Sequence, residues 1–103
     1  MFLNKSFSVS ITPSSGSMTS ASCTFYLPFT SDNVSQLVLT IGYFDNYTNV
    51  KINDTSVYVG RRETTNVDVT SKLTTSITKL TIEQSGNQNA LNGSVYFSTI
   101  ATK

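Results

Sequence analysis

The side chains best suited to contact a ligand lie in one short segment, residues 43–47. It places aromatic rings beside polar groups, in the order Tyr43, Phe44, Asp45, Asn46 and Tyr47. Aromatic rings can stack on the C–H groups of a sugar while carboxylate and amide groups bond its hydroxyls. Aromatic residues at a strand end also serve as core plugs or as anchors of protein interfaces, where tyrosine is enriched. The segment therefore predicts a contact surface, with a sugar, a protein partner and a core role all left open.

A second candidate is the pair Arg61 and Arg62, in an expected turn at residues 60–63. A guanidinium group can bind a carboxylate or a phosphate in bidentate fashion. Two arginines in a turn are also typical of a solvated cap. We include both residues among the candidate contact residues and assign no anion to them.

Oxygen ligands for a calcium ion are a further option. Asp45 with Asn46 and Asn49, or Asp54 with neighbouring carbonyls, supplies the oxygen donors that Ca²⁺ prefers. Asp and Asn are equally the residues that tight turns favour. We interpret them as turn formers and predict no metal ion and no cofactor.

The composition argues against catalysis. The chain has no His, which removes every mechanism that needs an imidazole base. Its single cysteine, Cys23, lies in an apolar alternation with no second Cys or His to activate it, so we expect a small core residue. The acidic residues show no spacing typical of a glycosidase pair; they are Asp32, Asp45, Asp54, Glu63, Asp68 and Glu83. We therefore predict no catalytic residues and no enzymatic activity.

The low charge of the chain limits the classes of partner that it can attract electrostatically. Only 13% of the residues are charged and the net charge is +1, against the roughly 25% charged residues of typical soluble domains. Such a chain offers no field for nucleic acid or an anionic membrane. No apolar segment approaches the roughly 20 residues that span a bilayer. Residues 1–7 lack an uninterrupted apolar run, so we expect no secretory signal.

The elements that must position these residues are strands. Ser and Thr make up 32 of the 103 residues, yet they alternate with Val, Ile, Phe and Leu, which favour β-structure. We expect eight strands, near residues 6–12, 21–29, 36–42, 50–52, 56–59, 65–69, 79–84 and 94–99. Asn53, Asp54 and Thr55 form the loop of a hairpin, Pro28 ends its strand or places it at an edge, and residues 85–93 form a loop. The pattern predicts one all-β domain over residues 1–103, an antiparallel β-sandwich of the jelly-roll type.

Several short motifs occur in an order that is similar to a known family. They are Phe25-Tyr26-Leu27-Pro28, Leu37-Val38-Leu39, Val50-Lys51-Ile52-Asn53-Asp54, Val67-Asp68-Val69-Thr70, Lys79-Leu80-Thr81-Ile82 and Gly93-Ser94-Val95-Tyr96-Phe97. This order resembles the galactose-binding-domain-like jelly rolls, including accessory domains of glycoside hydrolases and phage virion proteins. The resemblance covers about residues 23–98 and implies a jelly roll with a non-catalytic role. Two departures are Asp54, where the family usually has Gly, and the lack of Trp.

Together these observations lead to one expectation and one alternative. The expectation is a structural or adhesive protein of a phage or viral virion surface, such as a capsid decoration or fibre protein. It would dock onto other virion proteins or sister subunits and form a homo-oligomer or part of a larger assembly. We expect the chain to be made in the host cytoplasm without a signal peptide and to be located in the virion. The alternative is a carbohydrate-binding module that recognises cell-surface or polysaccharide glycans.

Overall fold

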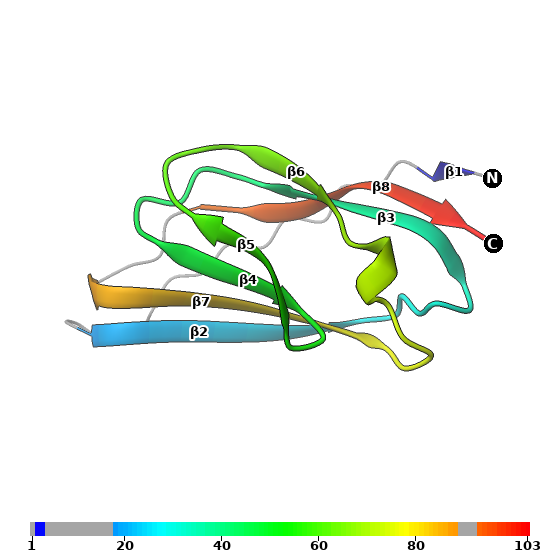
Figure 1. Cartoon of the computed structure of the whole chain (residues 1–103), viewed down its shortest axis with the longest axis horizontal. Helices are drawn as coiled ribbons and strands as arrows, with labels where there is room; N and C mark the ends of the chain where they lie inside the picture. The colour runs from blue at the N-terminus through cyan, green and yellow to red at the C-terminus, as the bar shows by residue number, and fades with distance from the viewer. Residues whose placement is uncertain (1, 4–17, 89–92) are drawn as a thin grey trace.

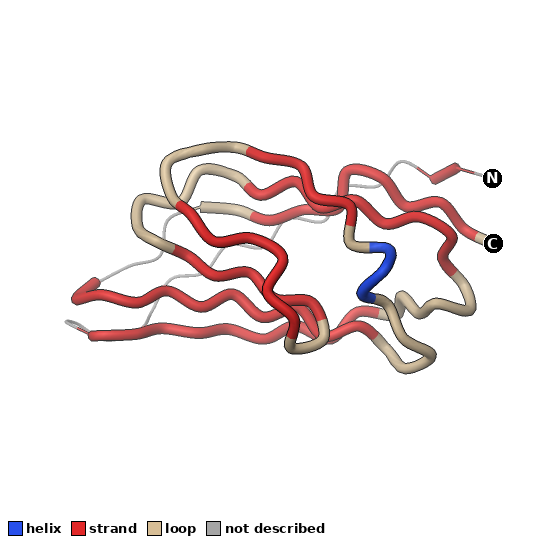
Figure 2. The backbone as a smooth tube through the Cα atoms, in the orientation of Figure 1, coloured by secondary structure: helices blue, strands red, loops and turns tan. Residues whose placement is uncertain are grey.

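Two β-sheets make up the part of the chain that the computed structural model describes, residues 2–3, 18–88 and 93–103 (Figure 1). The strands are β1 (Phe2–Leu3), β2 (Met18–Leu27), β3 (Val34–Ile41), β4 (Thr48–Ile52), β5 (Thr55–Gly60), β6 (Thr65–Asp68), β7 (Thr78–Gln88) and β8 (Val95–Thr102). One short 3₁₀ turn, η1 (Thr70–Lys72), is the only helical element among these residues (Figure 2). The predicted all-β class is confirmed.

The strand pairing follows a nested order. One sheet has the order β1-β8-β3-β6 and the other β2-β7-β4-β5, and every pair is antiparallel. Within the described residues, the first strand pairs with the last, β2 with β7, β3 with β6 and β4 with β5. A long hairpin folded across two sheets gives this order, which is that of a jelly roll. The predicted jelly-roll sandwich is therefore confirmed, with β1 contributing only two residues.

Both sheets turn apolar side chains toward one shared core. Along β4, Val50 and Ile52 are fully buried while Lys51 between them is partly exposed, as a period of two requires. The Phe29 and Phe97 rings meet edge to face, with centroids 5.4 Å apart. The buried cluster consists of Leu27, Val34, Leu37, Leu39, Ile41, Phe44, Val50, Ile52, Val69, Leu80, Ile82, Val95, Phe97 and Ile100. Leu80 and Ile82, which alternate with polar residues in the strand expected at residues 79–84, are both fully buried.

The strand that precedes Pro28 behaves as expected. β2 ends at Leu27 and is also an edge strand among the described residues, with β7 as its one neighbour. Pro28 lacks an N–H group and so cannot extend the ladder. Cys23 faces the same side as Phe25 and Leu27 and is half-buried, which agrees with a small apolar residue on the inner face.

Several predicted boundaries differ from the observed ones, most of all at the end of β7, and one predicted strand falls outside the described residues. We expected a loop from residue 85, whereas β7 continues to Gln88. The extension exists because β2 pairs with it, Ser20 with Ser85 and Met18 with Gln88, so a distant strand overrides the local preference of Ser, Gly and Asn for turns. The strand expected at residues 6–12 lies outside the described part of the chain.

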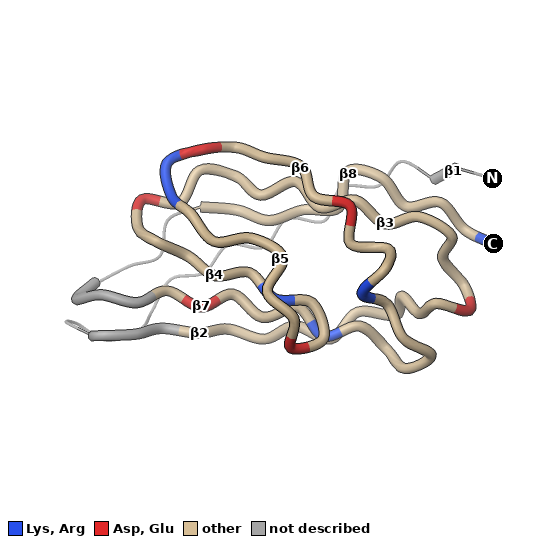
Figure 3. The backbone as a smooth tube through the Cα atoms, viewed as in Figure 1, with Lys and Arg blue, Asp and Glu red and all other residues tan. Residues whose placement is uncertain are grey.

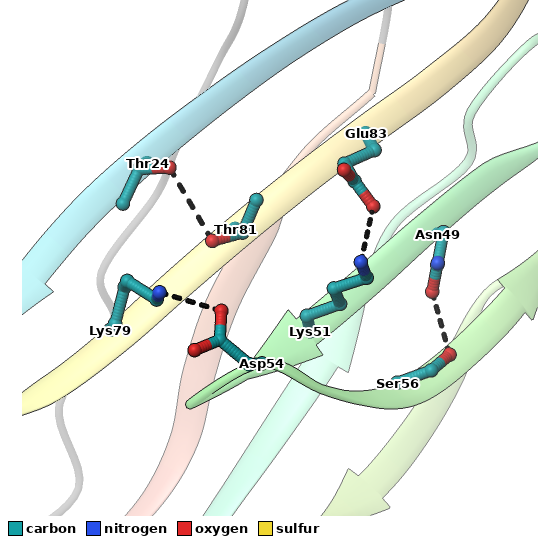
Figure 4. A network of polar contacts seen from close by, with 8 residues as sticks. All are labelled: Thr24, Asn49, Lys51, Asp54, Ser56, Lys79, Thr81 and Glu83. Carbon is teal, nitrogen blue, oxygen red and sulfur yellow. Dashed lines mark hydrogen bonds and ion pairs between the residues drawn. The ribbon is translucent and has the colours of Figure 1, made fainter.

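The outer face of the β2-β7-β4-β5 sheet carries polar side chains that meet across neighbouring strands (Figure 4). They form four contacts: Lys51 Nζ to Glu83 Oε1 at 2.9 Å, Lys79 Nζ to Asp54 Oδ1 at 2.6 Å, Ser56 Oγ to Asn49 Oδ1 at 2.6 Å, and the Thr24 and Thr81 hydroxyls at 3.4 Å. Exposed ion pairs of this kind contribute at most about 1 kcal/mol each. Their main effect is to favour one register of the strands.

Candidate functional site

The loop end of the sandwich brings the two candidate segments together. We use this name for residues 42–47 between β3 and β4, residues 61–64 between β5 and β6, and residues 93–94 before β8, which lie at one end of the molecule (Figure 1). The Arg62 N–H donates to the Phe44 carbonyl at 2.8 Å, and the Gly42 N–H donates to the Ser94 carbonyl at 2.6 Å. Backbone hydrogen bonds thus join all three connections.

Phe44 anchors the loop from inside. Its side chain is only 2% exposed and belongs to the core cluster. Gly93 packs directly against the Phe44 ring, and a side chain at position 93 would overlap ring atoms. For Phe44 the core alternative therefore holds, and the residue contributes to the surface only by fixing the backbone beside it.

Tyr47 and Arg61 form the central contact of the loop end. The Arg61 guanidinium carbon lies 4.6 Å from the centroid of the Tyr47 ring, a cation–π arrangement. The strand register explains it: Thr48 at the start of β4 pairs with Gly60 at the end of β5, so the flanking residues Tyr47 and Arg61 are adjacent. Tyr47 remains 57% exposed. The pair is a flat, exposed surface made of one ring and one guanidinium group.

The other candidate residues surround this pair. Tyr43 is 55% exposed, and Asp45 and Arg62 are also exposed, whereas Asn46 is partly buried. Arg62 adopts a left-handed backbone conformation, with φ of 58°, which reverses the chain at this turn. Figure 3 shows basic and acidic residues together on the connection between β5 and β6, which contains Arg61, Arg62 and Glu63, and an acidic residue on the neighbouring connection between β3 and β4.

Two residues that the sequence did not single out as functional shape the arginine turn. The Tyr58 hydroxyl donates to Glu63 Oε1 at 2.9 Å, which ties the end of β5 to the far side of the turn. Gly60 lies beneath this bond, and a side chain there would come within 2.5 Å of the Tyr58 hydroxyl and 2.6 Å of Glu63 Oε1. The signal in the sequence is a glycine between a tyrosine and an acid, which indicates close packing only once the turn is known.

The electrostatics of the same bond are unusual. Burial raises the pKa of Tyr58 to about 12, with further contributions from the hydrogen bond to Glu63 and from the charge of that carboxylate. A phenol that keeps its proton to such high pH acts as a stable hydrogen-bond donor and is a poor general base at neutral pH. The bond therefore has a structural role in holding the turn.

The residues considered as calcium ligands make other contacts in the structure. No group of three or more His, Cys, Asp or Glu side chains comes together in residues 2–3, 18–88 and 93–103. Of the residues considered for calcium, Asp54 pairs with Lys79 and Asn49 accepts from Ser56. The side chains that the loop end presents are the aromatic rings of Tyr43 and Tyr47, two guanidinium groups and the carboxylate of Asp45.

No protein-family model matches the chain, and no curated protein matches its sequence. In the described residues, no helix has the length and apolar character needed to cross a membrane.

Proposed function

We propose that this chain is a non-catalytic docking module that binds a partner protein through its loop end. The observation that carries the proposal is the stack of Arg61 on Tyr47, with Tyr43 exposed on the neighbouring connection. Tyr and Arg are the residue types, with Trp, that contribute most of the binding energy in protein interfaces. They supply large contact area and directional hydrogen bonds from few side chains.

The geometry of the stack favours a protein over a sugar at this point. Because Arg61 lies over the Tyr47 ring at 4.6 Å, one face of that ring is already occupied. A sugar that stacks on the same face would first have to displace the guanidinium group. A protein partner can instead use the pair as it stands, through the ring edge and the free N–H groups of the arginine.

The backbone beneath the pair supports the same proposal. The bonds from Arg62 to Phe44, from Gly42 to Ser94 and from Tyr58 to Glu63 hold the connections at the loop end in place. A surface that is already ordered loses little conformational entropy when a partner binds. For the same small interface area, this ordered surface should therefore bind a partner more tightly than a flexible loop would.

The proposal extends to a structural role at the surface of a phage or viral virion, with other virion proteins as the partners. Its support is the low charge and the excess of Ser and Thr, together with the jelly-roll order of the strands. Jelly rolls form both viral capsid and lectin domains, and a fold by itself does not select between them. The residues of the loop end therefore carry the argument for a protein partner.

Carbohydrate binding remains a second candidate because of Tyr43. This ring is 55% exposed, and the exposed Asp45 and partly buried Asn46 follow it in the chain. An aromatic face with adjacent carboxylate and amide groups is the arrangement that sugars use. The resemblance to galactose-binding-domain-like modules agrees with this candidate.

One experiment separates the two. The chain is mixed with purified virus particles from its own source and sedimented, and in parallel it is applied to a glycan array. For a protein partner we expect saturable binding to particles that falls at least about thirtyfold in the Tyr47→Ala, Arg61→Ala double variant. Ile77→Ala is the matched control, since Ile77 is equally exposed but lies at the opposite end of the sandwich.

Each outcome decides between the candidates. Equal binding by the double variant and the wild type would overturn the loop-end proposal. A glycan signal that is lost in Tyr43→Ala but kept in the double variant would establish the carbohydrate-binding alternative.

A further inference from the structure

The edges of the two sheets differ sharply in how they are protected. Among the described residues, β1, β6, β2 and β5 each have a neighbour on one side only. An edge strand presents unpaired N–H and C=O groups that can pair with another chain. Natural proteins block such edges by keeping them short, by placing charges or proline on them, or by bulges.

Three of the four edges carry such a device. β1 has two residues and β6 has four, of which Asp68 is charged and exposed. β5 contains a register shift opposite Val50 and Lys51 and lies between the charged turns at Asp54 and Arg61. Pairing of these three strands with another strand is therefore disfavoured by short length, by charged residues or by a register shift.

Between Ser20 and Leu27, β2 has none of these devices, and its one register shift lies at its start, between Met18 and Ser20. It is ten residues long, and none of them is charged or proline. Its register with β7 runs without a shift from Ser20 to Leu27. Figure 3 shows no charged residue along the described part of this strand, in contrast to the turns at either end of β5.

Three described side chains of β2, those of Cys23, Phe25 and Tyr26, are incompletely covered. Cys23 and Phe25 are half-buried, although their partners on β7, Ile82 and Leu80, have no exposed surface. On the outer face, Tyr26 is 68% exposed, the largest exposure of the large hydrophobic side chains in the described residues. An additional strand next to β2 would cover apolar atoms on both faces of the sheet.

We propose that two copies of this chain pair antiparallel through β2, with Thr24 at the twofold axis, to form a continuous eight-stranded sheet. A strand without charges can lie beside its own copy without placing like charges opposite each other. The commonest oligomer is a twofold dimer in which one surface binds its own copy. The inference depends on the β2 edge and is independent of the proposed function at the loop end.

The register follows from the side chains. With Thr24 opposite itself, Phe25 lies opposite Cys23 of the other copy and Tyr26 lies opposite Ser22, so that each large residue meets a small one. On the outer face, the Thr24 and Thr81 hydroxyls are 3.4 Å apart (Figure 4). The pairing extends this row of threonines across the axis, and Thr–Thr pairs are favourable cross-strand neighbours.

Sedimentation equilibrium of the full chain tests the pairing. We expect a discrete dimer for the wild type, and about a hundredfold weaker dimerisation for Thr24→Lys, because two ammonium groups would meet at the axis. The matched control is Thr55→Lys, the same change at an exposed position of the β5 edge, which should leave the dimer intact. A monomeric or polydisperse wild type would overturn the inference, as would equal behaviour of the two variants.

A covalent probe tests the register and does not depend on the lysine variant folding. In a Cys23→Ser background, Thr24→Cys should form a disulfide-linked dimer on mild oxidation, because directly opposite residues have Cα atoms about 4.5–5.5 Å apart, within disulfide range. Ser56→Cys in the same background is the control at the β5 edge. It should run as a monomer on a denaturing gel without reducing agent. No crosslink through Thr24→Cys, or equal crosslinking through both positions, would contradict the proposal.

Discussion

The two ends of the sandwich differ in what the side chains of their connecting segments contact. At the turn end, which comprises residues 28–33, 53–54 and 69–77, polar side chains bend back onto the backbone. Asn53 donates to the Lys72 carbonyl at 3.0 Å and accepts from the Lys79 N–H at 2.8 Å. At the loop end, Tyr43 and Tyr47 leave most of their surface exposed.

The same contrast holds for the remaining connections of the turn end. Asn33 accepts from the Thr30 N–H at 2.9 Å and donates to the Pro28 carbonyl at 3.1 Å. Asp68 Oδ1 accepts from both the N–H and the hydroxyl of Thr70, at 2.9 and 2.6 Å. These bonds satisfy backbone groups within the chain. We infer that the side chains of the turn end stabilise the fold, while the exposed side chains of the loop end are available to bind a partner.

The largest expected loss of stability comes from comparing a buried and an exposed aromatic residue of the loop end. Phe44→Ala removes a buried ring and should lower the free energy of unfolding by about 3–5 kcal/mol. Tyr47→Ala removes an exposed ring and a cation–π contact, and should cost no more than about 1 kcal/mol. Unfolding in guanidinium followed by circular dichroism measures both. Equal losses would show that the loop end is structural throughout.

The next effect tests the turn end. Asn53→Ala should lower the free energy of unfolding by about 2–4 kcal/mol, because it leaves the Lys79 N–H without its acceptor and places alanine at a φ of 50°. Asn53→Gly keeps the backbone conformation and loses only the side-chain bonds, so its cost should be smaller, about 1–3 kcal/mol. The same denaturation experiment applies. A neutral Asn53→Ala variant would contradict the role of the turn end.

The smallest effect is a difference in pH response between the two ends. The pKa of Tyr58 is raised from 10.0 to about 12, so its contribution to stability is complete below pH 10 and is lost as the pH rises toward 12. Bonds from Thr70 lower the pKa of Asp68 below 3.8, so its contribution is lost as the pH falls through that lowered value. Tyr58→Phe should flatten only the alkaline limb of stability, and Asp68→Asn only the acid limb.

Measurements of the unfolding midpoint across pH for both variants check this assignment. Asp54 raises the pKa of Lys79 through a hydrogen bond, so Lys79 also contributes to the alkaline loss in every variant. The comparison of Tyr58→Phe with the wild type isolates the phenol. An alkaline slope that is the same in Tyr58→Phe and in the wild type would exclude the Tyr58 phenol as a source of the alkaline loss of stability.

Much of the fold could be predicted because it depends on local signals. Alternation marked the strands, and Pro28 marked the end of β2. A hairpin with a loop at Asn53, Asp54 and Thr55 was also predicted; Asn53 and Asp54 adopt the left-handed conformation, with φ of 50° and 69°, whereas Thr55 already belongs to β5. The end of β7 was missed because only pairing with β2, far away in the sequence, makes residues 85–88 a strand.

The candidate site was predicted as two separate segments, and its central contact was not foreseen. Ile52 pairs with Thr55 next to the two-residue turn, but Val50 pairs with Tyr58, because one extra residue is inserted in β5. This bulge shifts the register by one and thereby places Tyr47 beside Arg61. A bulge has no reliable signal in a single sequence. Phe44 was named as a contact residue with a core role left open, and the structure places it in the core cluster beside Gly93.

The nested pairing of the strands has a consequence for how the chain reaches its fold. Only β4 and β5 are joined by a two-residue connection, so they can pair at little cost in loop entropy, whereas every other described pair encloses a longer stretch of chain. We expect pairing to begin at Asn53 and Asp54 and to proceed outward through β3–β6 and β2–β7 to β1–β8. Asn53→Ala should then slow refolding more than it accelerates unfolding. On this expectation, the turn that stabilises one end of the folded sandwich is also the site where strand pairing starts during folding.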